Sequence, residues 1–159
     1  MESGLSPLPQ GAGADPRAGP LLIGWREYLG FPDWGIRRVK VKIDTGARTS
    51  ALDVAGYELI EVDGQAVVAE LRLALHRKDP GRLTVVRAPV LGTAVVRNTS
   101  GVCEHRPLIE TTIRLGPVVK RVRLTVANRS RMRFRMILGR TALGGDFLVD
   151  VSKQYLLRS

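Results

Sequence analysis

The sequence lacks any long segment with helical periodicity, and this absence limits the fold more than any other feature. No run of about twelve residues or more repeats its apolar side chains every three or four positions. Residues 36–43 instead alternate, with Val39, Val41 and Ile43 on one side and lysines on the other. That is the two-residue period of a β-strand. About ten short segments of this type, separated by turn residues, predict an all-β barrel or sandwich.

The clearest local feature is a hairpin over residues 57–75. Two strand-like segments, 57–62 and 65–75, flank Asp63-Gly64. This dipeptide readily takes the positive φ angles that a two-residue turn requires. We therefore predict two antiparallel neighbours here.

Other strands follow from the same pattern. Residues 108–115 and 118–127 are expected to pair with each other, because a Gly-Pro turn separates them. Residues 83–96 are rich in β-branched side chains but contain Pro89, which has no N–H to donate, so we expect an edge strand. The apolar residues 154–157 are predicted as a final strand.

The chain is long enough for one domain and hardly for two. Residues 1–20, rich in Gly, Pro and Ala, are predicted to be a disordered tail, and residues 21–159 a single domain. There is no apolar run of membrane-spanning length and no signal-peptide layout at the start. The single cysteine, Cys103, allows no internal disulfide. We expect a cytoplasmic protein without a membrane partner.

The positive charge is concentrated in one part of the sequence. The chain has 25 basic and 15 acidic residues, and no Asp or Glu falls between Thr111 and Gly145. The basic residues of that block are Arg114, Lys120, Arg121, Arg123, Arg129, Arg131, Arg133, Arg135 and Arg140. Such a block can attract nucleic acid, ribosomes or acidic peptides, or it can be a solvated sheet face.

Asp44-Thr45-Gly46 is the candidate catalytic motif. It directly follows an apolar strand, so the carboxylate is expected at the strand end on a tight turn. Gly46 permits the close backbone approach of such a turn, and the Thr45 hydroxyl can bond to neighbouring main chain. An ordinary turn built on an Asp side chain is the alternative interpretation.

A second segment gives this motif a context. Residues 136–143 are an apolar strand, then Gly139 and Arg140, then a short predicted helix. This order resembles retroviral-type aspartic peptidases, in which an Asp-Thr-Gly-Ala turn and a later Gly-Arg segment cross beside the active site. The resemblance implies a retropepsin-like closed barrel with one short helix near the C-terminus. It also implies supporting roles for Ala47 and Gly139, and an ion-pairing role for Arg140.

Over the whole domain the chain resembles the bacterial and archaeal family labelled "ATP-dependent zinc protease", which is retropepsin-like. The shared blocks are residues 23–27, 42–52, 106–107, 111–113, 128–129, 139–143 and 147–150. Members often occur beside ATP-grasp glutamate ligases that extend a ribosomal protein, so trimming of glutamate tails is an implied role. Asp53 stands where members commonly have His, which weakens any metal or proton-transfer role for that position.

Neither zinc nor ATP is predicted from the residues. His76 and His105 are the only histidines, and Cys103, Glu104 and His105 form a thin ligand set. There is no phosphate-binding G-x-x-x-x-G-K-[ST] motif. We therefore expect no cofactor, although a zinc-dependent protease, as the family label states, is one alternative.

The mechanism implied by the resemblance needs two carboxylates, and the chain carries one Asp-Thr-Gly. We therefore expect a homodimer that brings two copies of Asp44 together to hydrolyse a peptide or protein substrate, with acidic tails as a candidate class. Arg48 is a candidate contact for an acidic substrate, and residues 83–106 lie where retropepsins keep a substrate-covering flap. The other alternative is an inactive basic barrel that binds RNA or ribosomes.

Overall fold

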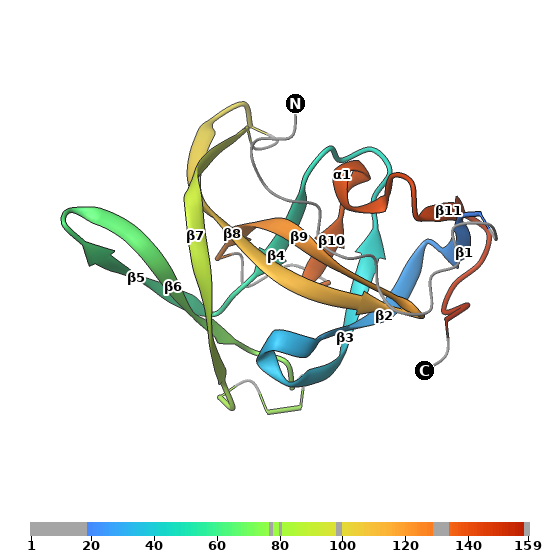
Figure 1. The fold of residues 1–159 in the computed structure, drawn as a ribbon, viewed down its shortest axis with the longest axis horizontal. Coiled ribbons are helices and arrows are strands. Elements are labelled where there is room, and N and C mark those ends of the chain that lie inside the picture. Colours follow the sequence, from blue (N-terminus) through green and yellow to red (C-terminus); the bar gives the residue numbers. More distant parts are fainter. Residues whose placement is uncertain (1–18, 77, 80, 98–99, 129–133, 158–159) are drawn as a thin grey trace.

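The computed structural model describes residues 19–76, 78–79, 81–97, 100–128 and 134–157, and these form an all-β domain (Figure 1). Two short helices are described, the 3-10 helix η2 (Pro32–Trp34) and the α-helix α1 (Arg140–Leu143). The strands are β1 (Leu21–Gly24), β2 (Arg26–Phe31), β3 (Ile36–Ile43), β4 (Ser50–Asp53), β5 (Gly56–Val62), β6 (Gln65–Leu73), β7 (Thr84–Arg97), β8 (Cys103–Leu115), β9 (Val118–Ala127), β10 (Met136–Leu138) and β11 (Phe147–Asp150).

The main sheet closes on itself. Its strand order is β2-β3-β10-β4-β9-β8-β7-β6-β5, and a further pairing between Gly30 and Arg114 joins β2 to β8. The ring of six strands from β2 to β8 is thus a barrel, while β1 and β11 pair in parallel as a separate ribbon. The predicted all-β closed barrel, with one short α-helix near the C-terminus, is confirmed.

The barrel is filled by apolar side chains from the inward-facing positions of its strands. The predicted inner residues of β3, Val39, Val41 and Ile43, are all buried. The largest fully buried apolar side chains include Phe31, Leu71, Ile109, Leu124 and Met136. Alternation along the strands therefore produces the core, as the two-residue period requires.

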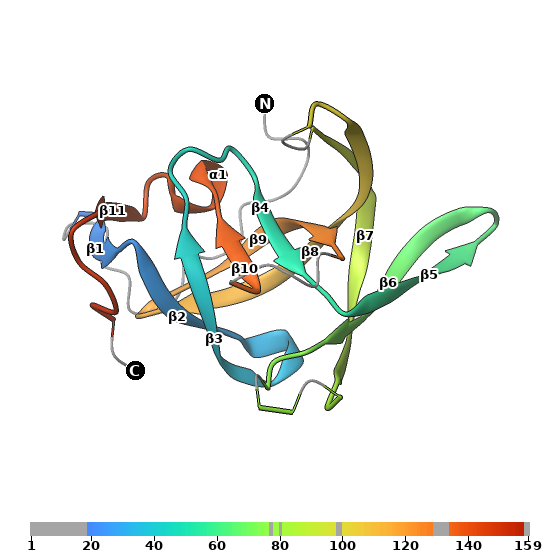
Figure 2. The same cartoon turned by 180° about the vertical axis from the view of Figure 1, so that it is seen from behind.

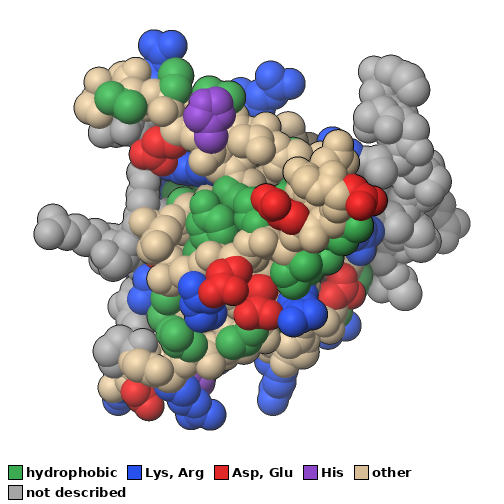
Figure 3. Space-filling model, turned by 90° about the vertical axis from the view of Figure 1, so that its left-hand side faces the viewer, with side chains coloured by type: hydrophobic (Ala, Val, Ile, Leu, Met, Phe, Trp, Pro, Cys, Tyr) green, Lys and Arg blue, Asp and Glu red, His purple; other side chains and the backbone are tan. Residues whose placement is uncertain are grey.

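The predicted hairpin is present as β5 and β6. Asp63 and Gly64 take φ angles of 54° and 80°, so the turn is the one that Asp-Gly favours. Figures 1 and 2 show this hairpin projecting from the barrel, and Figure 3 views the molecule from that side, with hydrophobic side chains exposed beside both acidic and basic ones. β5 is the sheet edge and carries Glu58 and Glu61, charges that discourage further strand pairing.

The prediction that residues 83–96 form an edge strand is wrong. β7 pairs with β6 up to Pro89 and with β8 from Val90 onward, so it changes partner in the middle. The register shifts between Val90 and Gly92, at a bulge. Proline is tolerated because each half of β7 is bonded on one side only within the described residues.

Residues 154–157 are not a strand, which corrects a second prediction. This segment instead lies along β1 and β2, where the Trp25 N–H donates to the Lys153 carbonyl and the Tyr155 N–H donates to the Arg26 carbonyl. The carboxylate of Glu27, which is fully buried, accepts hydrogen bonds from the N–H groups of Gly24, Leu156 and Leu157 at 2.7–3.0 Å. An apolar tail is held here by a buried carboxylate rather than by strand pairing.

Several cations of the basic block are neutralised on the barrel wall. Lys120 pairs with Asp146, and Arg121 and Arg123 both approach Glu110. Arg129, Arg131 and Arg133 lie outside the described residues, as does the predicted tail up to residue 18. No helix in the described part of the chain is long and apolar enough to cross a membrane.

The role of Glu27 can be tested by stability. Replacing Glu27 by Ala leaves three backbone donors without their partner, and each such loss costs about 1–3 kcal/mol. We expect Glu27→Ala to lower the free energy of unfolding by roughly 3 kcal/mol or more, which corresponds to a fall of about 6–12 °C in melting temperature.

Two further variants serve as controls. Glu27→Gln keeps one carbonyl acceptor, so its melting temperature should fall between those of wild type and Glu27→Ala. Glu61→Ala removes an exposed carboxylate from β5 and should change the melting temperature little. Equal melting temperatures for Glu27→Ala and Glu61→Ala would contradict this role for Glu27.

Candidate active site

The Asp44 turn is fixed by β10, which lies between β3 and β4. β3 and β10 run parallel, with Val41–Ile43 opposite Met136–Leu138. The Asp44 N–H donates to the Leu138 carbonyl at 2.8 Å, so the carboxylate starts where this pairing ends. Asp44 Oδ1 accepts the Gly46 N–H at 3.1 Å, and the Asp44 carbonyl accepts the Ala47 N–H at 3.2 Å. The carboxylate is half-buried on a turn of fixed shape.

Gly139 is the point at which the two motif segments cross. A Cβ on this residue would lie 2.6 Å from the Thr49 carbonyl oxygen and 2.8 Å from that of Ala47. The Gly139 N–H donates to the buried Ser50 hydroxyl at 3.0 Å. The contact is therefore closer than any side chain permits, and it ties the β10–α1 junction to the part of the Asp44 loop that leads into β4.

Arg140, the next residue, also contacts the Asp44 loop, but through hydrogen bonds rather than the expected ion pair. Its N–H donates to the Ala47 carbonyl at 2.8 Å, and its guanidinium donates to the Thr45 carbonyl at 3.1 Å. Within the described residues Arg140 forms no ion pair, so it braces the loop through main-chain oxygens. Thr141 adds two bonds to the Arg48 carbonyl, from its N–H and its hydroxyl.

The loop presents its motif to solvent at one end of the barrel. Thr45, Gly46 and Arg48 are exposed, while Asp44 and Ala47 are half-buried. Figures 1 and 2 show the end of β7 and the start of β8 at the same end of the molecule as the loop that joins β3 to β4. The structure thus brings together Asp44, Thr45, Gly46, Ala47, Arg48, Gly139 and Arg140.

Asp53 does not belong to this site. It ends β4, three residues beyond Ser50, and its buried carboxylate pairs with the Arg135 guanidinium at 3.0 Å. Asp150 is also engaged locally, because the hydroxyl and N–H of Ser152 donate to its Oδ1. These bonds hold the pKa of Asp150 below its usual range. Both carboxylates are therefore engaged by partners other than the Asp44 turn.

No metal-binding group of three or more His, Cys, Asp or Glu side chains is found among the described residues. Cys103 and His105 lie two residues apart on β8, and both are exposed. Opposite them on β7 are Arg97 and Val95, which do not ligate metal. The residues present at this place therefore do not fit a structural zinc site.

Residues 22–159 match a family described as RimB-like, the retropepsin-like aspartic endopeptidase RimB. The chain belongs to this family. The match covers the whole described domain except its first residues, and the retropepsin-like resemblance drawn from the motifs is confirmed. Membership of this family supports a peptidase-like fold.

Curated relatives carry this domain inside a longer protein. A probable alpha-L-glutamate ligase of Desulfotalea psychrophila is 35% identical over 138 residues, which are 86% of this chain and 29% of that protein. One from Shewanella halifaxensis is 32% identical over 138 residues, 86% of this chain and 30% of its own length. The chain therefore spans less than a third of these relatives.

A solved structure from Legionella pneumophila, the protein Lpg0085 of unknown function, shares the fold of this RimB-like domain. Its TM-score is 0.69 at 18% identity, and the superposition covers 87% of this chain and 98% of that one. At this identity the likeness concerns the fold alone.

Sequence reasoning assigned no role to Ser50 or Lys120. Ser50 lies inside the motif block, but only the structure shows that its hydroxyl receives the Gly139 N–H. Lys120 was one of the block cations, yet its ammonium bonds to the Ala142 carbonyl and to Asp146, which holds the end of α1 against β9. A basic residue facing the carbonyl end of a helix is favourable, but no local sequence signal places it there.

The crossing at Gly139 can be tested with a methyl group. Gly139→Ala puts a Cβ against two carbonyl oxygens that belong to the Asp44 loop, so the loop has to move. We expect a loss of roughly 3 kcal/mol in the free energy of unfolding, and loss of any activity that depends on Asp44. Chemical denaturation measures the first effect.

Gly144→Ala is the matched control. Gly144 has a φ of −59°, and a Cβ there would meet nothing closer than the Arg140 carbonyl oxygen at 3.4 Å. This variant should stay within about 0.5 kcal/mol of wild type. Similar destabilisation by the two substitutions would contradict the special role of position 139.

Proposed function

We propose that this RimB-like domain is an aspartic endopeptidase whose catalytic group is Asp44. The observation that carries the proposal is a half-buried carboxylate on a rigid, solvent-facing turn in a chain of the RimB-like family. The bond from the Asp44 N–H to β10 holds the main chain, and the bond from the Gly46 N–H holds the carboxylate, before any substrate arrives. Preorganisation of this kind is what acid–base catalysis requires.

The reaction needs a second carboxylate. Two carboxyl groups in contact share one proton, so one activates a water molecule as a base while the other protonates the carbonyl oxygen of the peptide as an acid. Asp53 and Asp150 are held elsewhere. A two-fold symmetric dimer supplies the missing group, because it places two Asp44 turns face to face.

Thr45 and Gly46 shape the catalytic turn, while Ala47, Gly139 and Arg140 support it. The Arg140 guanidinium on the Thr45 carbonyl, and the Arg140 N–H on that of Ala47, keep both flanks of Asp44 in place. The β7–β8 hairpin lies at the same end of the barrel and is suited to cover a bound peptide (Figure 2). Each half of a dimer would contribute one turn and one hairpin.

Glutamate-rich tails are the substrate class that we favour. The curated relatives that contain this domain are named probable alpha-L-glutamate ligases, so trimming glutamate chains pairs with making them. Arg48 lies beside the motif, and its exposed guanidinium forms no hydrogen bond or ion pair within the described residues. It is a candidate contact for an acidic side chain of the substrate.

The central role of Asp44 is tested by Asp44→Asn, which preserves the shape of the side chain but cannot ionise. We expect cleavage of a glutamate-rich peptide to fall by about a thousandfold or more, with little change in melting temperature. Asp63→Asn is the matched control, because Asn also tolerates the positive φ of that turn, and it should keep full activity.

The same assay separates the alternatives. Activity that survives EDTA and is lost in Asp44→Asn agrees with the proposal, whereas loss in EDTA with rescue by zinc favours the zinc hydrolase. Retention of RNA by a protein without any peptidase activity favours a basic binding module. Full cleavage by Asp44→Asn would exclude the mechanism.

A site shared between two chains also predicts a concentration dependence. Diluting the protein converts dimers to monomers by mass action, so activity per chain should fall as the dimer dissociates. Light scattering on the same dilution series reports the oligomeric state. Undiminished activity per chain in a fully monomeric sample would rule out the shared site.

A further inference from the structure

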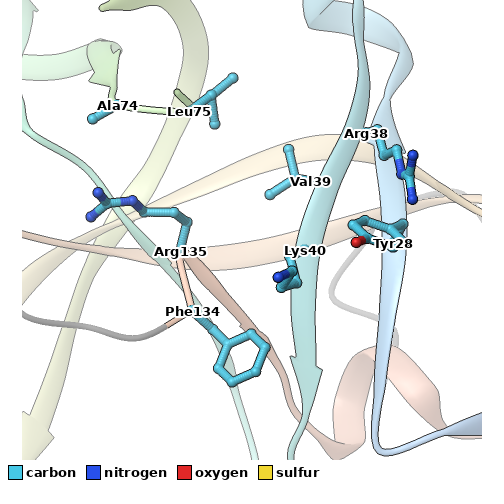
Figure 4. Close-up of a pocket in the computed structure, with 8 residues that line it drawn as sticks. All are labelled: Tyr28, Arg38, Val39, Lys40, Ala74, Leu75, Phe134 and Arg135. Carbon is cyan, nitrogen blue, oxygen red and sulfur yellow. The ribbon is translucent and has the colours of Figure 1, made fainter. Parts of the chain in front are cut away.

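A cleft of about 310 Å³ opens beside β3, away from the Asp44 turn. It is lined by Tyr28, Arg38, Val39, Lys40, Ala74, Leu75, Phe134 and Arg135. Figure 4 shows Ala74, Leu75 and Arg135 on one side of it and Arg38 and Tyr28 on the other, with Val39 and Lys40 of β3 between them. The volume is at the small end of the range for ligand pockets.

The cleft exists because β3 is only partly paired. On one side, β2 pairs with β3 from Ile36 to Lys42. On the other side, β10 covers only Val41–Ile43, and β6 ends at Leu73 just before the cleft. In the described part of the chain, no strand pairs with this side of β3 at residues 38–40. An extended peptide can add to such an open strand edge.

Three positive side chains line the cleft, and two of them have no acidic partner among the described residues. Arg38 is exposed and Lys40 half-buried, and neither side chain forms a hydrogen bond or ion pair within the described residues. The Arg135 guanidinium is instead engaged by Asp53. The lining contains no carboxylate. This contrasts with the barrel wall, where Lys120, Arg121 and Arg123 have acidic partners.

Stacking holds the Arg38 side of the cleft in place. The Arg38 guanidinium lies 3.7 Å from the centroid of the Tyr28 ring, and Tyr155 stacks on the same ring at 4.7 Å. Tyr155 is held in turn by its N–H bond to the Arg26 carbonyl. Since Arg38 and Tyr155 both already pack against the Tyr28 ring, less of this ring is open for stacking a nucleic-acid base.

The remaining lining is apolar. Val39 and Phe134 are buried, and Leu75 is half-buried, so they offer contacts to methylene groups rather than to a phosphate. A ligand that fits therefore has a carboxylate for Arg38 and Lys40, a short aliphatic stem, and a main chain for the strand edge. A glutamate residue within an extended peptide has all three.

We propose that this cleft is a second binding site for acidic peptide, which holds a glutamate-containing segment of the substrate remote from the bond that is cut. The inference rests on the proposed function and adds a site to it. Asp44 directly follows β3, four positions after Lys40, which is about 13 Å along an extended chain. The cleft would thus hold a segment about four residues away from the scissile bond.

The test measures binding apart from cleavage. A fluorescent peptide of about ten glutamates is titrated into the Asp44→Asn protein, which cannot hydrolyse it by the proposed mechanism. We expect Arg38→Ala and Lys40→Ala each to weaken binding by roughly fivefold, and binding to weaken as salt rises. Arg37→Ala removes the same charge from the neighbouring exposed position outside the cleft, so it should bind like its parent.

Competing ligands show which chemical group the cleft recognises. A glutamine peptide of the same length should not compete, and neither should inorganic phosphate at the same concentration. Equal losses in all three variants would show a general effect of net charge and overturn the inference. Tighter binding of a single-stranded RNA that depends on Arg38 and Lys40 would also overturn it.

The inference and the proposed function can fail separately. Suppose that the wild-type protein cleaves the peptide, and that Arg38→Ala and Lys40→Ala bind and cleave it normally. Peptide binding at the cleft is then refuted, while the proposed peptidase activity is supported. If no cleavage occurs but the peptide binds with the expected pattern of losses, binding at the cleft is supported and the proposed peptidase activity is refuted.

Discussion

The contact between Gly139 and the Asp44 loop is the constraint on which the rest of the site depends. β10 is only three residues long, yet it lies between β3 and β4 and joins the two strands that flank the loop. Because Gly139 has no side chain, the chain can bond to Ser50 at this point and to Ala47 at the next residue. The carboxylate is thus positioned by main-chain packing, and a turn fixed in this way keeps its geometry when a substrate binds.

The distribution of charge differs between the barrel wall and the cleft that we propose as a binding surface. On the barrel wall, cations of β9 face carboxylates of β8 and of the segment after α1, and they serve mainly to join these elements. Beside β3, Arg38 and Lys40 face no described carboxylate. The buried Glu27 contributes to this second surface indirectly, because it holds the C-terminal segment from which Tyr155 stacks on Tyr28. If the cleft binds acidic peptide as proposed, stability and recognition are linked through one buried carboxylate.

Local pattern was sufficient for most of the fold. Alternation located β3, the Asp-Gly turn located β5 and β6, and the Gly-Pro turn separated β8 from β9, because these elements depend on neighbours in sequence. The two wrong strand predictions concern segments whose structure depends on contacts with residues far away in the sequence. β7 changes partner at Pro89, and the segment 154–157 is hydrogen-bonded to Glu27, which lies more than 120 positions away in the sequence. At the site, the motif residues could be identified from the sequence. Only the folded structure shows the main-chain bonds of Arg140, the Ser50 bond and the pairing of Asp53 with Arg135.

Two Asp44 carboxylates from two chains are proposed to form one catalytic site. Wild-type and Asp44→Asn chains co-refolded in varied proportions at constant total concentration test it directly. If only pairs of wild-type chains are active, activity falls with the square of the wild-type fraction, and an equal mixture retains about a quarter of it. A linear decline, with about half of the activity in the equal mixture, would show a site complete within one chain and would contradict the account.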